Sequence, residues 1–263
     1  MAVLERERLA EYSIESRIYK SLVDSIYAGR VTKVVPGINA AFVDCGVGRP
    51  GFLNCMETSS ELIGKGLQTS SAPPEEGSMV MVQIKSDARG EKGPRLSRMI
   101  SLVGKYVVWR PLGARITVSN RIVRGLERQR LADIGMNIKT ADEGLTVRTQ
   151  AENRKRNELH SEVSELRAIW GEISEQYKIA QKPMLLWTGP SAIRQFLDLH
   201  LTAKIDKIVV DDKEIFGEVK GYGELHLPDI MERLELRYPT SKLLASTNLE
   251  EQFEEIRAPE VRL

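Results

Sequence analysis

The segment Ser25–Asn54 limits what this 263-residue chain can fold into more than any other part of it. Two short runs of β-forming residues, Ile26–Val35 and Ala40–Asp44, flank the turn residues Pro36-Gly37, and a second glycine-rich turn leads into Phe52-Leu53. Short strands that alternate with tight turns are typical of a small antiparallel barrel. The sequence therefore predicts such a barrel in the first part of the chain.

Two aromatic residues of this segment, Phe42 and Phe52, lie among the basic residues Arg30, Lys33 and Arg49. Exposed rings beside cations suit single-stranded nucleic acid, because the rings stack on bases and the cations hold phosphates. An aromatic residue in a strand is, however, often a core residue. From the residues alone, both a nucleic-acid platform and a barrel core are open.

The barrel is expected to extend over residues 22–102. A helix over 59–67 and a loose loop over 68–77 interrupt it, and a strand over 79–85 resumes it. A charged turn between two apolar runs predicts a hairpin within residues 1–20.

A mixed region of strands and helices follows the barrel. Strands are predicted at 106–109, 115–118 and 145–149, with a helix over 124–134 that Gly135 ends. The clearest helix is marked by apolar residues that recur at steps of four and three, namely Leu159, Val163, Leu166, Trp170, Ile173 and Tyr177. This stripe favours contact with a core, and a coiled-coil seam is the alternative.

The last third of the chain alternates between strands and helices. A strand at 184–187, a helix from Ser191 to Leu201 and a strand at 205–210 predict a βαβ-like unit. A short helix near 215–220, a strand near 234–238 and an acidic helix near 249–256 complete the pattern.

The net charge of +1, from 38 basic and 37 acidic residues, predicts no partner by itself. The distribution is more informative. Residues 85–105 contain six basic and two acidic side chains, whereas residues 250–260 contain five glutamates and one arginine. A basic middle and an acidic end favour one nucleic-acid face over a uniformly basic protein.

The two cysteines, Cys45 and Cys55, are too few for a zinc site. Free thiols are expected, with a disulfide as the alternative. No apolar run approaches the roughly 20 residues of a membrane span. The charged N-terminal residues are unlike a signal peptide. The sequence therefore predicts a cytoplasmic protein without a membrane span.

The segment Ser25–Asn54 resembles the S1 RNA-binding domain of the ribonuclease E/G family. The residues that carry the resemblance are Ile26-Tyr27, Gly29-Arg30-Val31, Pro36-Gly37, Ala40–Asp44, Gly46 and Gly51-Phe52-Leu53. The resemblance continues through nearly the whole chain. It implies that Phe42 and Phe52 stack on RNA bases and that Lys92 contacts RNA; the alternative for Lys92 is a solvated loop charge.

The resemblance also implies an α+β fold in which an RNase H-like domain is split. Its two parts would be residues 1–20 and 182–263. The S1 barrel, an OB-fold, would occupy residues 21–104, and a small α/β 5′-sensor subdomain would occupy residues 105–181.

Arg148 and Thr149 end the predicted strand at 145–149. An arginine can grip a terminal phosphate with two N–H donors, and a neighbouring hydroxyl adds a third contact. The pair resembles part of the family's 5′-monophosphate pocket, to which Gly104 and Val108 correspond at the other positions. The alternative is an Arg-Thr pair that closes a strand with a surface ion pair.

No catalytic or metal-binding residue is predicted. Asp211-Asp212 follow a strand and could hold Mg²⁺, but aspartate is also a favoured helix N-cap, which is the preferred interpretation. The three histidines, His160, His200 and His226, lie apart from any nucleophile pattern and are expected to be surface or capping residues.

The expected function is single-stranded RNA binding and 5′-end recognition, within a ribonuclease E/G-type endoribonuclease that acts in rRNA processing and mRNA decay. The resemblance implies a preference for 5′-monophosphorylated RNA, Mg²⁺ as the cofactor of the full family enzyme, and room for a homo-oligomer. It further implies a chain cut at both ends, without the family's catalytic segment. This chain alone is therefore expected to bind no cofactor and to be inactive.

Two other functions stay open. The first is a stand-alone RNA-binding protein without catalysis, and the second is a structural S1 adaptor that ignores the RNA 5′ end.

Overall fold

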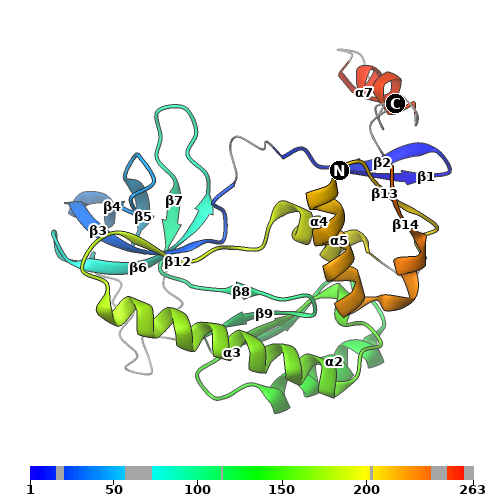
Figure 1. Ribbon diagram of the computed structural model, residues 1–263. Coiled ribbons are helices and arrows are strands. Elements are labelled where there is room, and N and C mark those ends of the chain that lie inside the picture. The colour runs from blue at the N-terminus through cyan, green and yellow to red at the C-terminus, as the bar shows by residue number, and fades with distance from the viewer. Residues whose placement is uncertain (16–20, 57–72, 114, 202–203, 238–247, 258–263) are drawn as a thin grey trace. The chain divides into compact units, whose positions relative to one another are not determined.

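The computed structural model describes residues 1–15, 21–56, 73–113, 115–201, 204–237 and 248–257 (Figure 1). The chain divides into two compact units. One consists of Met1–Lys20 with Ser191–Leu263, and the other is Ser21–Pro190. The helix predicted over 59–67 and the first half of the loop predicted over 68–77 lie outside the described residues.

The Ser21–Pro190 unit contains a closed five-stranded, OB-like barrel, which confirms the predicted α+β class. Its strands are β3 (Ile26–Val35), β4 (Ala40–Asp44), β5 (Gly51–Asn54), β6 (Met79–Ser86) and β7 (Arg95–Ser97). They pair in the order β3-β4-β5-β7-β6, and β6 closes the barrel on β3. Only β5 and β7 are parallel neighbours among these pairs.

The first part of β3, the longest strand of the barrel, is buried on both faces. Alternate side chains of a strand point to opposite faces. Ile26 and Ala28 belong to the core that lies under the neighbouring sheet, whereas Tyr27 and Val31 belong to the barrel core. Position 29 of this strand requires glycine, because a Cβ there would approach Val43 Cγ1 to 2.4 Å.

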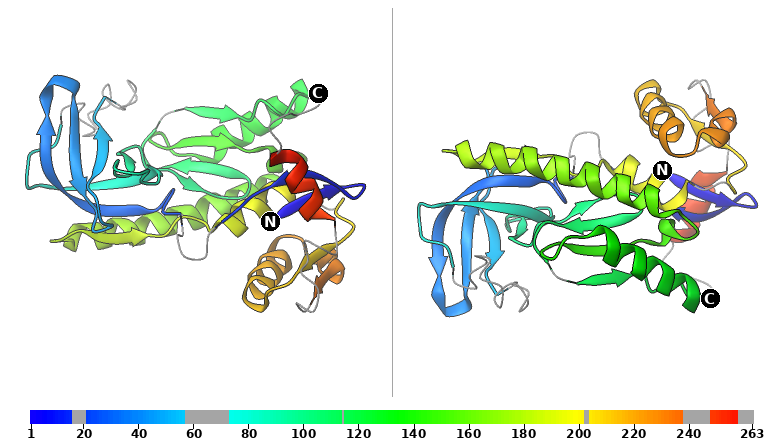
Figure 2. Two further views of the ribbon diagram at one scale, coloured as in Figure 1. Left: turned by 90° about the horizontal axis from the view of Figure 1, so that it is seen from above. Right: turned by 90° about the horizontal axis from the view of Figure 1, so that it is seen from below.

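A four-stranded sheet forms the rest of this unit's β-structure, in the order β10-β11-β9-β8. Its strands are β8 (Leu102–Val103), β9 (Val107–Arg110), β10 (Ile116–Val118) and β11 (Gly144–Val147). Helices α2 (Gly125–Ile138) and α3 (Arg156–Ile179) pack against it (Figures 1 and 2).

The stripe of α3 is core contact, as predicted. Leu159, Val163, Leu166 and Ile173 are buried, and Trp170 and Tyr177 pack partly buried against the same core.

Two expectations about this unit are wrong. Helix α2 does not end at Gly135 but continues to Ile138, and Gly135 lets the helix pack closely on Ile116 and Leu145. The predicted βαβ unit is also absent, because β12 (Met184–Trp187) pairs antiparallel with β3 instead. The parallel crossover lies later in the chain, where β13 (Ile208–Val210) pairs with β14 (Leu234–Leu236).

The other unit has a small core of its own. The predicted hairpin forms from β1 (Ala2–Glu5) and β2 (Arg8–Tyr12), and α7 (Leu249–Arg257) packs on it, with the rings of Tyr12 and Phe253 edge to face at 5.1 Å. Helices α4 (Ala192–His200) and α5 (Lys213–His226) join β13, β14 and the 3-10 helix Pro228–Arg233 around the core. The core side chains are Leu197, Leu201, Val210, Val219, Tyr222 and Ile230.

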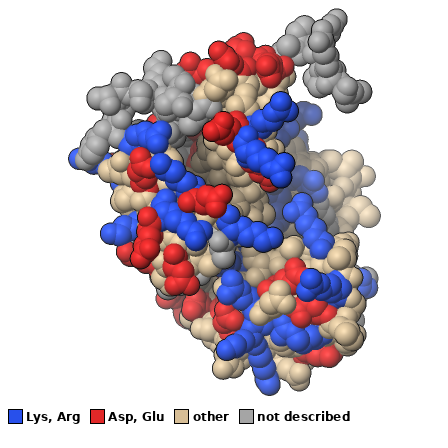
Figure 3. All heavy atoms as spheres, turned by 90° about the vertical axis from the view of Figure 1, so that its right-hand side faces the viewer, with Lys and Arg blue, Asp and Glu red and all other residues tan. Residues whose placement is uncertain are grey.

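On the face shown in Figure 3, basic and acidic side chains are interspersed, as expected for 38 basic and 37 acidic residues. Within the described residues, no helix combines the length and the apolar character needed to cross a membrane.

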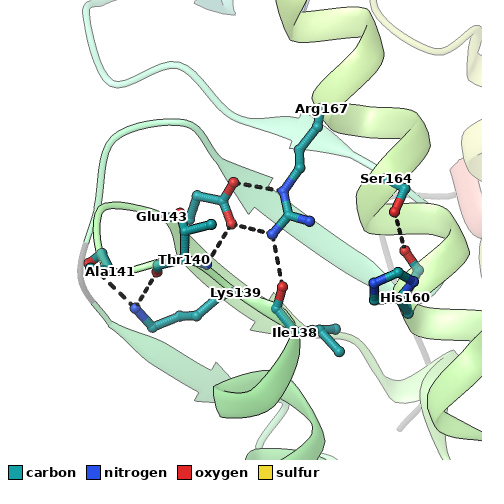
Figure 4. A network of polar contacts seen from close by, with 8 residues as sticks. All are labelled: Ile138, Lys139, Thr140, Ala141, Glu143, His160, Ser164 and Arg167. Carbon is teal, nitrogen blue, oxygen red and sulfur yellow. Dashed lines mark hydrogen bonds and ion pairs between the residues drawn. The ribbon is translucent and has the colours of Figure 1, made fainter.

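A partly buried ion pair ties α3 to the loop after α2 (Figure 4). The Arg167 guanidinium donates to both carboxylate oxygens of Glu143 at 2.7 Å and to the Ile138 carbonyl at 2.7 Å. Glu143 also accepts from the Thr140 amide at 2.9 Å. Burial opposes ionisation of Glu143, but the contacts with Arg167 and Thr140 outweigh it and hold the pKa of this carboxyl below its ordinary value.

Replacing Glu143 with glutamine should lower the free energy of unfolding by about 1–3 kcal/mol, because hydrogen bonds between charged groups are lost. The depressed pKa means that this stabilisation is present above the unfolded-state pKa of about 4.3 and is lost as the pH falls through the folded-state pKa. The thermal midpoint of the variant should therefore fall less steeply on acidification. Circular dichroism melts across the acid range measure both effects.

Glu175→Gln is the matched control, because Glu175 pairs with Lys178 on the exposed surface of the same helix. An exposed pair contributes only about 0–1 kcal/mol. If Glu143→Gln melts like this control at every pH, the ion pair with Arg167 does not stabilise the fold.

Candidate nucleic-acid interface

A hollow of about 810 Å³ opens on the outside of the barrel, and we call it the barrel groove. Its lining combines two aromatic residues with charged side chains of both signs. The aromatic residues are Phe42 and Phe52, the basic ones are Lys33, Arg49, Arg89, Lys92 and Arg95, and the acidic ones are Asp87 and Glu91. The excess of basic side chains suits a polyanion.

Phe42 and Phe52 face each other across β4 and β5, where they are paired in register. Their ring centroids are 5.9 Å apart at an interplanar angle of 69°. Both side chains are half-buried, whereas their strand neighbours Ala41, Val43 and Leu53 are completely buried. The rings therefore lie on the outer face of the sheet and outside the barrel core.

The basic side chains surround this aromatic pair. Lys33 is in register with Phe42, and Arg95 is in register with Phe52, so each ring has a cation beside it on the neighbouring strand. Lys92 is exposed and lies in a tight hairpin, where its backbone N–H and C=O both bond to Arg89 at 3.0 Å.

Asp87 is held at the edge of the groove by two hydrogen bonds. Its carboxylate accepts from the Ser21 hydroxyl at 2.7 Å and from the Leu22 amide at 2.8 Å. This carboxylate therefore anchors the loop that carries Lys92 to the start of β3.

The structure brings three of the predicted 5′-phosphate residues together. Gly104 begins the turn between β8 and β9, Val108 lies in β9, and Arg148 directly follows β11, which pairs with β9. The Arg148 guanidinium donates to the Gly104 carbonyl.

Thr149 begins the 3-10 helix Thr149–Ala151, next in the chain to Arg148. Its hydroxyl lies 2.9 Å from that of Ser119, the residue after β10. The four predicted residues thus come from the ends of neighbouring strands in one sheet.

Sequence reasoning missed one residue of this region, Glu162. Its carboxylate accepts hydrogen bonds from three consecutive backbone amides of the β8–β9 turn, those of Lys105, Tyr106 and Val107. The sequence feature that could have indicated Glu162 is its position in the helical pattern. It lies three residues after Leu159 and one before Val163, which places it on the inward face of α3.

The carboxylates at 211–212 do not form a metal site in the described structure. Asp212 caps α5, because its Oδ1 accepts from the amides of Glu214 and Ile215 at 2.9 and 3.0 Å, as the preferred interpretation predicted. Within the described residues, no group of three or more His, Cys, Asp or Glu side chains is placed to hold a metal ion.

The histidines and cysteines are the remaining residues considered in the sequence. His160 is exposed on α3. His200 Nε2 lies 3.5 Å from Glu11 Oε1. The side chain of His226 is outside the described part of the chain. Both cysteines are free and buried, as expected, and burial raises the pKa of the Cys45 thiol to about 12.

The sequence profile of the Ribonuclease E/G family matches residues 101–263, which is more than half of the chain. The chain belongs to the ribonuclease E/G family. It is 30% identical to Ribonuclease E of Haemophilus influenzae over all of its own length and 29% of that protein. It is 29% identical to Ribonuclease G of Haemophilus influenzae and of Escherichia coli, over 90% and 89% of this chain and half of each relative.

This ribonuclease E/G family chain thus spans half or less of the length of these relatives. The profile match covers the four-stranded sheet and the β13–β14 region, while the alignment with Ribonuclease E also includes the barrel. Membership assigns the chain to a ribonuclease family, and the closed barrel fits an S1-like fold.

Proposed function

We propose that this chain binds single-stranded RNA in the barrel groove and recognises a 5′-monophosphate beside Gly104. It would do so as part of a ribonuclease E/G-type endoribonuclease that acts in RNA processing and decay. The observation that carries the proposal is the half-exposed pair of Phe42 and Phe52, with Lys33 and Arg95 in register beside them.

The chemistry of the groove supports single-stranded nucleic acid over polyanions that lack bases. Every base has a π-face, so two outward rings can stack on successive bases without selecting a sequence. The cations at the groove edge can then hold the phosphates between those bases.

The residues after β11 support recognition of the RNA end. The guanidinium of Arg148 offers a fork of N–H donors that matches phosphate oxygens. Thr149 follows Arg148 in the chain, and its hydroxyl lies 2.9 Å from that of Ser119. A terminal monophosphate has more charge than an internal phosphodiester, so this arrangement would favour a 5′-phosphorylated end.

The proposal includes features that rest on the family resemblance. These are action in the cytoplasm, Mg²⁺ as the cofactor of the whole enzyme and a homo-oligomer of the whole enzyme. The domain identities, with an S1 barrel at 21–104, a 5′-sensor at 105–181 and a split RNase H-like domain at 1–20 and 182–263, have the same basis.

A stand-alone RNA-binding protein without catalysis is the second candidate. One observation favours it: Asp212, a carboxylate considered for Mg²⁺, caps helix α5 instead. The two candidates share the groove and differ only in whether this chain takes part in RNA cleavage.

Replacing Phe42 or Phe52 with alanine should weaken binding of a single-stranded oligoribonucleotide by about 1–3 kcal/mol for each stacked base lost. Because both rings lie outside the barrel core, the thermal midpoint should stay nearly unchanged. Fluorescence anisotropy and circular dichroism melts measure the two quantities. Phe253→Ala is the control, since Phe253 is also half-buried but belongs to the other compact unit, where its ring packs on Tyr12.

Lys92→Ala tests the cations in the same assay. It should make the dependence of log affinity on log salt shallower by about 0.7, the value for one phosphate contact on a single strand. Lys178→Ala, on the exposed side of α3, should leave the slope unchanged. Unfolding of both phenylalanine variants would mean that the rings are core residues and would contradict stacking. Equal slopes for Lys92→Ala and Lys178→Ala would contradict a phosphate contact at Lys92.

The chain should bind a 5′-monophosphorylated oligoribonucleotide more tightly than the same RNA with a 5′-hydroxyl. A charge-assisted contact is worth about 1.5–3 kcal/mol, which sets the upper limit of the difference. Arg148→Ala should abolish the preference without changing affinity for the 5′-hydroxyl RNA. Arg156→Ala, an exposed arginine at the start of α3, is the matched control. A wild-type chain that binds both RNAs equally contradicts 5′-end recognition.

The 263-residue chain should not cleave single-stranded RNA in the presence of Mg²⁺, because a metal ion needs several oxygen ligands in fixed positions. A gel assay with 5′-labelled RNA tests this, with a full-length relative as the positive control. Cleavage that Asp211→Ala and Asp212→Ala remove, in variants that still fold, would place an active site at the start of α5.

A further inference from the structure

The turn between β8 and β9 directs three consecutive backbone N–H groups at one carboxylate. Glu162 accepts from the amides of Lys105 at 2.6 Å, Tyr106 at 2.8 Å and Val107 at 2.9 Å. The turn is closed on itself by a bond from the Gly104 amide to the Val107 carbonyl at 2.8 Å. Successive N–H groups that converge in this way form an anion-binding nest, and here the anion is a side chain of α3.

Gly104 is required by this contact. A Cβ at position 104 would lie 2.6 Å from Glu162 Cδ and 2.7 and 2.9 Å from its two oxygens. The missing side chain at this position therefore lets the carboxylate reach the backbone.

The same turn is also bound by Arg148. The Arg148 guanidinium donates to the Gly104 carbonyl, and its backbone amide donates to the Tyr106 carbonyl at 2.8 Å. Glu162 therefore takes the N–H groups of the turn while Arg148 takes two of its carbonyl groups. Arg154 adds a third restraint, since its guanidinium lies 5.5 Å from the centre of the Tyr106 ring.

We propose that Glu162 is a positioning residue for the 5′-phosphate site, an inference that rests on the proposed 5′-end recognition. By binding the three amides, Glu162 fixes the Gly104 carbonyl, and that carbonyl orients the guanidinium of Arg148. Without the carboxylate, the turn would be free to rotate its peptide groups, and Arg148 would lose its fixed direction.

The opposite role for the same geometry is that Glu162 occupies an anion site in place of RNA. The two roles predict opposite effects. If Glu162 positions Arg148, its removal weakens binding of the 5′-phosphate; if it occupies the phosphate site, its removal strengthens that binding.

The experiment compares the affinities of one short single-stranded oligoribonucleotide with a 5′-monophosphate and with a 5′-hydroxyl. Glu162→Gln keeps the size of the side chain but sets an N–H₂ group against backbone donors. The preference for the monophosphate should fall roughly tenfold, the loss expected for hydrogen bonds to a charged group. Affinity for the 5′-hydroxyl RNA reports the barrel groove and should stay unchanged. Glu172→Gln, at an exposed position of the same helix, should behave like the wild type.

An unchanged preference in Glu162→Gln, or tighter binding of the monophosphate, overturns the positioning role while the proposed function stands. A wild-type chain without any preference overturns the proposed 5′-end recognition itself, and the positioning role with it. If Glu162→Gln does not fold, Glu162→Asp is measured in its place. The shorter carboxylate reaches fewer of the amides, so a reduced preference supports the role and a wild-type preference overturns it.

Discussion

The burial of both faces of β3 is the constraint on which the Ser21–Pro190 unit depends. Each fully buried large apolar side chain contributes about 1.5–3 kcal/mol, and β3 places such side chains in two different cores. Ile26 and Ala28 belong to the core that β3 shares with the four-stranded sheet and its helices α2 and α3. Tyr27 and Val31 belong to the barrel core. A strand held on both faces cannot change its register by one residue without exchanging the two sets. The barrel is thereby fixed to the neighbouring sheet.

This constraint determines what the barrel can present to a ligand. β4 and β5 follow β3 in the sheet order, so their register is set by a strand that cannot shift. Their inward side chains fill the barrel core, which leaves Phe42 and Phe52 on the outer face beside the cations of β3 and β7. Binding groups on rigid strands are held more accurately than groups on loops.

The four-stranded sheet has a second kind of restraint, made by charged side chains of α3. Glu162 holds the β8–β9 turn, and Arg167 holds the loop after α2 through Glu143. The apolar stripe of this helix builds the core, and the polar residues at its margin fix the loops around it. One helix thus sets both the packing of the sheet and the backbone beside Arg148.

Much of this arrangement could be predicted from local patterns. Strands and turns predicted the barrel, steps of three and four predicted the buried face of α3, and the position of Asp212 predicted its cap. The helix end predicted at Gly135 was wrong. A glycine in a helical pattern predicts an end from local sequence alone, whereas here the missing side chain allows close contact of α2 with Ile116 and Leu145. The pairing of β12 with β3 was missed because an apolar strand does not specify its partner.

The candidate site could be predicted only in part. The two aromatic residues among basic ones were visible in the sequence, but only the structure shows that Ala41 and Val43 are buried and that the ring of Phe52 lies opposite Phe42. The role of Glu162 could not be predicted, since its partners lie more than fifty residues away in the chain. Contacts of that kind follow from the packing of the helix and not from any local pattern.

The most direct test of the central claim is the NMR signal of the phenylalanine rings during titration with a short single-stranded oligoribonucleotide. The chain has only five phenylalanines, so labelled rings can be assigned by substitution. If the groove binds RNA by stacking, the resonances of Phe42 and Phe52 shift together and saturate, while those of Phe196, Phe216 and Phe253 stay in place. RNA binding that leaves the rings of Phe42 and Phe52 unshifted would contradict the account.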